Sequence, residues 1–420
     1  MIPELRSDFN AKYKPELYSE LLALLGRRCG GAIPFRVAET PIFVPGNMLA
    51  EMAEEGAEIA HYLIGDAEYL AAARGEIPAG FDVANQTARP HFLTADFALI
   101  RTTAGELVPK LVEIQAFPSV FAYQAVCCGA YREVFGLPGS LGTFLSGLDE
   151  SSYWELLRST ILGKHAPENV VLTEIDPLNQ KTFPDFHLTS ERLGMPIVDI
   201  RAIEANGDRL YYRDRSGRSV RIHRIYNRAI ADELIARKIQ LPFDLTRPWE
   251  VEWAGHPNWY FLISKFSIPW LTRKGSFPVV PPAAFVDDFL AGPGREALVA
   301  AGVPLPDGPD AGTIYEDLLL KPLFSFAGMG IEFEPSRARL EAIPPAERGS
   351  YLVQQRMRFE PTIGTPFGLT QAEIRILYLW PDDGRLTPAL SLVRLGRGKM
   401  MGVDHNKDQE WVGGSAAFYI

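Results

Sequence analysis

Two runs of alternating apolar residues, close together in the first third of the chain, constrain the fold most. Phe92 to Arg101 and Leu107 to Gln115 alternate as β-strands do, and the short segment Thr-Thr-Ala-Gly lies between them. A turn at residues 104–105 makes a hairpin in which Asp96 lies directly opposite Glu113. The chain therefore needs a sheet that tolerates two facing carboxylates.

The facing carboxylates predict a cation. Like charges directly opposite each other destabilise a sheet unless a partner neutralises them, and a divalent cation can do so. Gln115 projects from the same face as Glu113 and offers a third oxygen. Magnesium takes one or two carboxylates and completes its shell with water and phosphate oxygens, so Asp96, Glu113 and Gln115 are the candidate ligands. The alternative is an acidic hairpin face that only meets solvent.

The rest of the sequence is that of a mixed α/β protein. Residues 14–88 read as helices, residues 169–228 alternate short apolar runs with a helix, and residues from 253 onward form a further α/β unit. The chain has 42 basic and 52 acidic residues, and the resulting net charge of -10 argues against a nucleic acid partner. Three cysteines cannot form a disulfide framework, and no segment is apolar enough to span a membrane, so we expect a cytoplasmic protein.

A lysine at the end of a strand introduces a glycine loop. Lys321 follows three leucines and precedes Pro322, and Gly328 and Gly330 come shortly afterwards. A strand, a lysine and a flexible glycine loop suit a nucleotide, whose phosphates the backbone can approach closely. Such glycines also occur in ordinary turns.

Other polar residues lie within apolar segments. Lys265 has aromatic neighbours and needs either a path to solvent or an anionic partner. Gln354 and Gln355 end a strand, where their amides can bond an adenine edge or close a sheet margin. Glu373 and Arg375 share one face of the next strand and can pair with each other.

A basic stretch precedes the C-terminus of this acidic chain. Arg394, Arg397 and Lys399 are followed by Asn406 and by the pair Gly413-Gly414. Such a cluster can stabilise the charge on a phosphoryl group during its transfer.

The order of these features resembles the ATP-grasp superfamily. That family has a first lysine, a proline-marked turn, a Lys-Pro strand with a glycine loop, a strand that ends in glutamine and an acidic-x-Arg strand. The matching segments are Lys265, Val280-Pro-Pro282, Leu320-Lys-Pro322, Val353-Gln-Gln355 and Glu373-Ile-Arg375. Arg394, Asn406 and Gly413-Gly414 resemble the elements that follow.

The closing element of the family, Glu-x-Asn-x-x-Pro after an acidic strand, appears near the beginning instead. Asp96, Glu113-Ile-Gln115 and Pro118 resemble it, which implies a circularly permuted domain. That arrangement is similar to eukaryotic-type glutathione synthetase and to glutathionylspermidine synthase. The implied α/β (α+β) fold has an N-terminal helical region (1–90), a permuted hairpin with the metal ligands (91–149), an α/β substrate domain (150–245) and a main ATP-grasp domain (246–420).

The resemblance implies an ATP-dependent ligase that joins a small carboxylate to an amine through an acyl-phosphate. It assigns Asp96, Glu113 and Gln115 to Mg2+, gives Arg375 and Arg394 the role of stabilising the transferring phosphoryl group, and lets Arg228 hold the substrate. The residues that it places around ATP are Lys265, Lys321, Gly328, Gly330, Gln354 and Gln355. It implies no nucleic acid or membrane partner, and it allows a homodimer.

Three departures from those synthetases bear on the substrate. Gln115 stands where the family has asparagine, Ser325 and Phe326 occupy the place of a metal-binding glutamate, and Leu93-Thr-Ala-Asp96 lacks a substrate-binding arginine. A glutathione-type substrate is therefore not supported. A carboxylate kinase, a non-catalytic Mg-ATP-binding module and a plain α/β scaffold stay open as alternatives.

Overall fold

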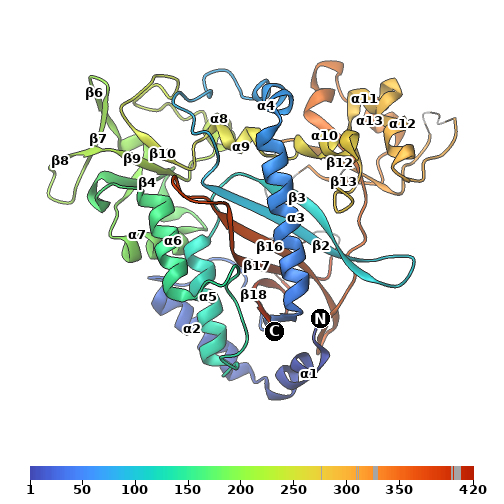
Figure 1. Ribbon diagram of the computed structural model, residues 1–420, viewed down its shortest axis with the longest axis horizontal. Helices are drawn as coiled ribbons and strands as arrows, with labels where there is room; N and C mark the ends of the chain where they lie inside the picture. The colour runs from blue at the N-terminus through green and yellow to red at the C-terminus, as the bar shows by residue number, and fades with distance from the viewer. Residues whose placement is uncertain (276, 309, 311, 325–329, 399–400, 402–407) are drawn as a thin grey trace.

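Strands from both ends of the chain build the central sheet of the protein (Figure 1). The computed structural model describes residues 1–420 except 276, 309, 311, 325–329, 399–400 and 402–407. The order across this sheet is β1-β18-β17-β16-β2-β3, with β15 paired to β16. Its strands are β1 (Ile42–Val44), β2 (Phe92–Arg101), β3 (Leu107–Gln115), β15 (Ile363–Thr365), β16 (Gly368–Leu379), β17 (Thr387–Gly396) and β18 (Gly413–Tyr419).

Helices cover both faces of the central sheet. Alternate residues of a strand point to opposite faces, so Ala95 and Phe97 of β2 pack in the core with α3 (Gly46–Gly65). Phe92 instead packs with α5 (Phe121–Val134), and α2 (Pro15–Arg28) and α6 (Glu150–Leu162) join the same core. The even-numbered residues of β2, Asp96 among them, therefore belong to the α5 face.

A second sheet is parallel and lies beside the first (Figure 1). Its order is β10-β9-β4-β5, and its strands all run in the same direction. The strands are β4 (Val170–Glu174), β5 (Ile197–Asp199), β9 (Arg224–Asn227) and β10 (Glu252–Ala254), with α7 (Phe183–Leu193) between β4 and β5 and a meander of β6 (Glu204–Asn206), β7 (Arg209–Arg213) and β8 (Ser219–Ile222) before β9.

A third sheet, which we call the smaller sheet because it has fewer strands than the central one, lies on the opposite side of the molecule and carries its own helices (Figure 1). Its order is β11-β14-β12-β13. It contains β11 (Ala283–Phe285), β12 (Leu318–Pro322), β13 (Glu332–Phe333) and β14 (Tyr351–Gln355), with α9 (Asn258–Leu262), α10 (Ser267–Lys274), α11 (Val286–Ala291), α12 (Pro293–Ala300) and α13 (Arg337–Glu341) around it. The remaining helices are α1 (Pro3–Lys12), α4 (Ala67–Arg74) and α8 (Ala231–Ala236).

The hairpin prediction is confirmed, although its register arises differently. Asp96 does pair with Glu113, but Arg101 pairs with Leu107, and a bulge beside Asp96 corrects the register by one residue. The sequence analysis missed β1, because three buried residues carry no period of their own and lie in a segment that reads as helical. Within the described residues, no helix is long and apolar enough to cross a membrane.

At Gly56, α3 packs closely against the central sheet. A Cβ at this position would overlap the hydroxyl of Tyr378 and lie 3.0 Å from the Cβ of Ala95. We expect Gly56→Ala to lower the free energy of unfolding by about 1–3 kcal/mol, because the added methyl pushes the helix away from the sheet. Chemical denaturation measures this change. Gly65→Ala in the same helix, where no described neighbour lies within 4 Å of the added Cβ, is the control, and equal midpoints would contradict the close packing.

Candidate functional site

Three charged residues lie in one row across the central sheet. Arg375 of β16 is the cross-strand neighbour of Asp96 on β2, and Asp96 is the neighbour of Glu113 on β3. Directly opposed residues share a face, so all three side chains project on the α5 side of the sheet. The partner that the structure places beside the facing carboxylates is thus an arginine.

Asp96 and Arg375 form a two-pronged ion pair. Nε and Nη2 of Arg375 donate to the two carboxylate oxygens of Asp96 at 2.5 and 2.6 Å, and Nη2 of Arg394 donates to Oδ2 at 3.2 Å. Asp96 is only 1% exposed. Burial opposes its ionisation, but the two guanidinium groups outweigh burial and lower the pKa of Asp96. Asp96 is therefore a carboxylate whose two oxygens both accept hydrogen bonds from arginine.

Glu373 pairs with a different arginine. It lies directly opposite Arg394 on β17, whose Nη1 donates to its Oε1 at 2.6 Å. Burial raises the pKa of Glu373 to about 7, although Arg394 opposes the shift. Glu373 and Arg375 do not pair with each other, because a directly opposed neighbour on the next strand lies closer than a residue two positions along the same strand.

Two lysines approach this row, one from the smaller sheet and one from the segment between α9 and α10. Lys265 lies between α9 and α10, and its Nζ is 3.8 Å from Oε2 of Glu113. Lys321 lies on β12, and its Nζ donates to Oε1 of Gln354 at 2.7 Å. Burial lowers the pKa of Lys321 to about 8, while the charge of Glu113 opposes that shift. The cluster therefore joins residues from the central and the smaller sheets.

Glu113 is the carboxylate of the row that is held least tightly. Its oxygens lie 3.8 Å from Nζ of Lys265 and 3.8 Å from Nη2 of Arg375, which is beyond hydrogen-bond distance. Gln115 follows two residues later on the same face. Two such oxygens suit magnesium, which needs few protein ligands when phosphates supply the rest. In the part of the chain that the structure describes, no three His, Cys, Asp or Glu side chains form a larger metal-binding group.

The metal role predicted for Asp96 stays a prediction. Its lone pairs are directed at Arg375, so Glu113 and Gln115 are the better fit to a cation in this arrangement.

A cavity of about 280 Å³ lies where the segment after β14 meets β16. It combines apolar walls with amide and guanidinium groups, and its lining includes Phe333, Arg356, Met357, Gln371 and Arg397. Gln355 lines a neighbouring cavity of about 550 Å³, and residues 356–358 contribute to both cavities.

Of the residues predicted for the glycine loop, Gly330 has a φ of 76°, a conformation that favours glycine. Gly328, Lys399 and Asn406 lie outside the described residues.

Arg228 directly follows β9 and is 3% exposed. Its guanidinium lies over the rings of Phe117 and Phe186, and its Nη1 is 3.5 Å from Oδ2 of Asp185. Among the described residues, Nε and Nη1 of Arg228 and Oδ2 of Asp185 have no hydrogen-bond partner. Because buried polar groups are normally hydrogen-bonded, this arrangement suits a polar ligand.

The sequence analysis missed three residues of these clusters. Glu174 ends β4 and is buried, which raises its pKa to about 8. Asp185 is fully buried in α7, and Oγ of Ser119 accepts a hydrogen bond from Nη1 of Arg375 at 3.3 Å. The position of Glu174 could have been found from the sequence, because it ends a short apolar run that reads as a parallel strand. Ligands bind at the carboxyl ends of such strands, and Arg228 follows β9 at the same edge of the sheet.

Comparisons with known proteins support the fold. No family model matches the chain, and a search of curated proteins finds no match. A solved structure, a glutathione synthetase-like effector from Globodera pallida in its apo form, is similar with a TM-score of 0.56 over 97% of this chain and 98% of that one. The two sequences are 12% identical, so the likeness concerns the fold alone. The mixed α/β fold with several sheets is similar to the fold of that glutathione synthetase-like protein.

Removal of Asp96 should destabilise the protein strongly. We expect Asp96→Asn to lower the free energy of unfolding by about 3–5 kcal/mol, since it leaves the buried guanidinium of Arg375 without a directly paired charge. Chemical denaturation followed by circular dichroism measures this loss. Asp8→Asn breaks an exposed ion pair with Lys12 and should leave the midpoint unchanged. Equal midpoints for the two variants would show that the buried pair contributes little.

Proposed function

We propose that this protein is an ATP-dependent carboxylate–amine ligase built on a circularly permuted ATP-grasp domain. The observation that carries the proposal is the meeting of Asp96, Glu113 and Arg375 on one sheet with Lys265 and Lys321 beside the other. Cations on both sides of a carboxylate row suit a magnesium-bound polyphosphate.

The strand order supports the permutation. β2 and β3 come early in the chain, yet β2 pairs with β16 and so extends the sheet of the late strands β16, β17 and β18. A hairpin that closes the domain in the usual chain order therefore lies at its beginning here. The likeness of the whole chain to a glutathione synthetase-like structure agrees with this topology.

Each candidate residue has a role in the proposal. Glu113 and Gln115 would hold magnesium, which would offset part of the negative charge of the phosphates. The charges of Lys265 and Lys321 face the phosphates. The proposal assigns Gln354 and Gln355 to the base, and Gly328 and Gly330 to the phosphates. Asp96 holds Arg375 in position through its two hydrogen bonds.

The reaction proceeds in two steps. A carboxylate oxygen of the substrate attacks the γ-phosphorus of ATP, the bond to the bridging oxygen breaks, and ADP leaves with the electron pair. The amine then attacks the carbonyl carbon of the acyl-phosphate, loses a proton and displaces inorganic phosphate. Arg375 and Arg394 stabilise the charge that develops on the phosphoryl and carbonyl oxygens, which is the largest protein contribution in such transfers.

Arg228 is the proposed anchor for the substrate. Nε and Nη1 of Arg228 have no hydrogen-bond partner among the described residues and can bond a carboxylate of the substrate, and Oδ2 of Asp185, which forms the ion pair with Nη1, can accept a hydrogen bond from the same molecule. The adjacent rings of Phe117 and Phe186 fix the plane of the guanidinium.

Calorimetry of ATP binding tests the site. We expect wild-type protein to bind ATP with magnesium and Glu113→Ala to lose the magnesium dependence, because Glu113 supplies the proposed metal ligand. Glu106→Ala, in the exposed turn of the same hairpin, is the matched control and should bind as wild type does. Failure of folded wild-type protein to bind ATP with or without magnesium would overturn the proposed function.

The pH dependence of that binding tests Lys321. Its pKa of about 8 in the ligand-free protein should rise when phosphates lie next to it, because they favour the ammonium form. Binding at pH about 8.5 should therefore take up protons, and affinity should fall as the pH rises further. Calorimetry in two buffers of different ionisation heat measures the uptake. Persistent uptake in Lys321→Gln would assign the proton to another group.

Product analysis separates the ligase from its alternatives. In a screen of carboxylates with amines, a ligase releases ADP and phosphate together with an amide. A carboxylate kinase releases ADP and gives a hydroxamate when hydroxylamine traps its product, whether or not an amine is present. Binding of Mg-ATP without ADP release would favour the non-catalytic module, to which the capture of both Asp96 oxygens by Arg375 lends some support.

A further inference from the structure

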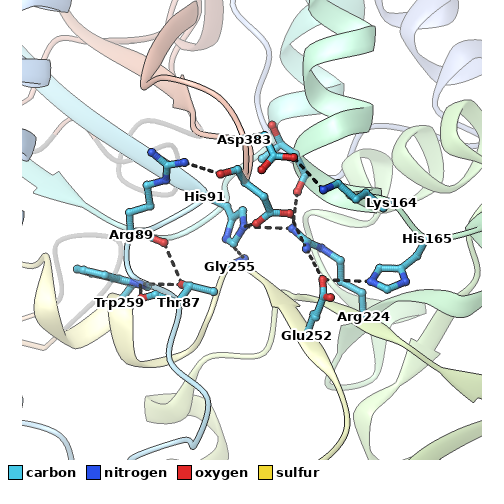
Figure 2. Close-up of polar contacts among 12 residues, drawn as sticks. Thr87, Arg89, His91, Lys164, His165, Arg224, Glu252, Gly255, Trp259 and Asp383 are labelled. Atoms are coloured by element: carbon cyan, nitrogen blue, oxygen red, sulfur yellow. Dashed lines mark hydrogen bonds and ion pairs between the residues drawn. The ribbon is translucent and has the colours of Figure 1, made fainter.

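A second ion-pair cluster surrounds the buried Arg224, beyond the C-terminal end of β16. Figure 2 shows Arg224 at its centre. Nη1 of Arg224 donates to Oε2 of Glu252 at 2.8 Å and to Oδ2 of Asp382 at 2.9 Å, and Nη2 donates to the carbonyl oxygen of Thr160 at 3.1 Å. Asp382 also lies 2.7 Å from Nε2 of His91. We call Arg224, Asp382, Glu252 and His91 the clasp.

In the clasp, Arg224 and Asp382 are charged and the imidazole of His91 is neutral. The side chain of Arg224 is 2% exposed, whereas that of Asp382 is 43% exposed. Burial lowers the pKa of His91. The pKa of Asp382 also lies below its usual value, because its hydrogen bond with His91 and the neighbouring Arg224 outweigh the opposing effect of burial. Because the ionised carboxylate of Asp382 can only accept, Nε2 of His91 carries the proton and donates it to Oδ1 of Asp382, while Nη2 of Arg224 lies 3.1 Å from the same nitrogen.

The clasp joins the two strands that lead to the proposed substrate site. Arg224 is the first residue of β9, and Arg228 follows directly after that strand. Asp382 lies in the turn after β16, the strand that carries Arg375. A strand advances about 3.3 Å per residue and is held by its ladder, so a shift at one end is transmitted to the other.

One face of β9 is seated against the central-sheet domain along its whole length. Arg224 and Tyr226 alternate in β9 and therefore share that face, and Arg228, directly after the strand, continues the alternation. Arg224 bonds Asp382, the ring of Tyr226 lies 5.2 Å from that of Phe92, and Arg228 lies over Phe117. The contact between the rings of Tyr226 and Phe92 sets the distance between β9 and the central sheet. The ion pair of Arg224 with Asp382 sets the position of β9 along that sheet, because its hydrogen bonds are directional.

We propose that Arg224 and Asp382 are positioning residues that set the register of β9 against β16, and so hold Arg228 and Arg375 on the same substrate. This inference rests on the proposed function of those two arginines. Neither clasp residue touches the substrate. A displacement of about 1 Å at a reacting centre can cost as much as two orders of magnitude in rate, so a fixed register matters more here than the stability of the ion pair.

The test compares two neighbouring substitutions in one turn. Asp382→Asn removes the negative charge beside Arg224 and one of the two oxygens that accept from Arg224 and His91, whereas Asp383→Asn removes the exposed ion pair of Asp383 with Lys164 and is the matched control. We expect Asp382→Asn to raise the KM for the carboxylate that gives the fastest ADP release about tenfold, with the KM for Mg-ATP within about twofold of wild type. Asp382→Glu should restore most of the loss, because it keeps the carboxylate.

Hydrogen exchange provides a readout that needs no substrate. Asp382→Asn should speed exchange in peptides that cover residues 224–230, far along the chain from the substitution, and Asp383→Asn should not. Equal exchange in these peptides for both variants, or a KM change shared by Asp383→Asn, would overturn the clasp. If wild-type protein does not bind Mg-ATP, the proposed function is overturned instead. The exchange experiment would still test whether Asp382 holds β9 in position.

Discussion

The ion pair between Asp96 and Arg375 is the interaction on which the rest of the site depends. It joins two residues that are 279 positions apart in the chain, and it lies in a sheet that buries both side chains. Buried charges are costly unless they are paired and hydrogen-bonded. Arg394 of β17 extends the row, because it bonds both Asp96 and Glu373, and the charges on β2, β16 and β17 thus compensate one another.

The same physical arrangement recurs where the parallel sheet meets the central one. Arg224 is buried between strands of different sheets and is satisfied by Asp382, Glu252 and a backbone carbonyl. Aromatic contacts such as Tyr226 with Phe92 lie between this cluster and Arg228. Apolar packing supplies most of the adhesion at such a junction because it is non-directional, and the charged groups specify the register because their hydrogen bonds are directional.

Local patterns predicted the local structure well, and distant partners could not be predicted from them. The alternation in residues 92–115 gave both hairpin strands and the meeting of Asp96 with Glu113, although a bulge rather than the turn alone produced it. That Arg375 would neutralise Asp96 depends on which strand lies beside β2, and periodicity carries no such information. Asp185 was missed for the same reason, since its partner Arg228 comes from another element.

The charge of the cluster fits a polyanion within an acidic protein. Arg375, Arg394, Lys265 and Lys321 bring four cations to three carboxylates, Asp96, Glu113 and Glu373, while the whole chain carries a net charge of -10. Because burial raises the pKa of Glu373 to about 7, part of its negative charge is absent near neutral pH, which increases the positive excess. A cluster whose own ion pairs are satisfied and which still has positive charge to spare is organised before a ligand arrives. Preorganised charge of this kind stabilises phosphoryl transfer without a cost of rearrangement during the reaction.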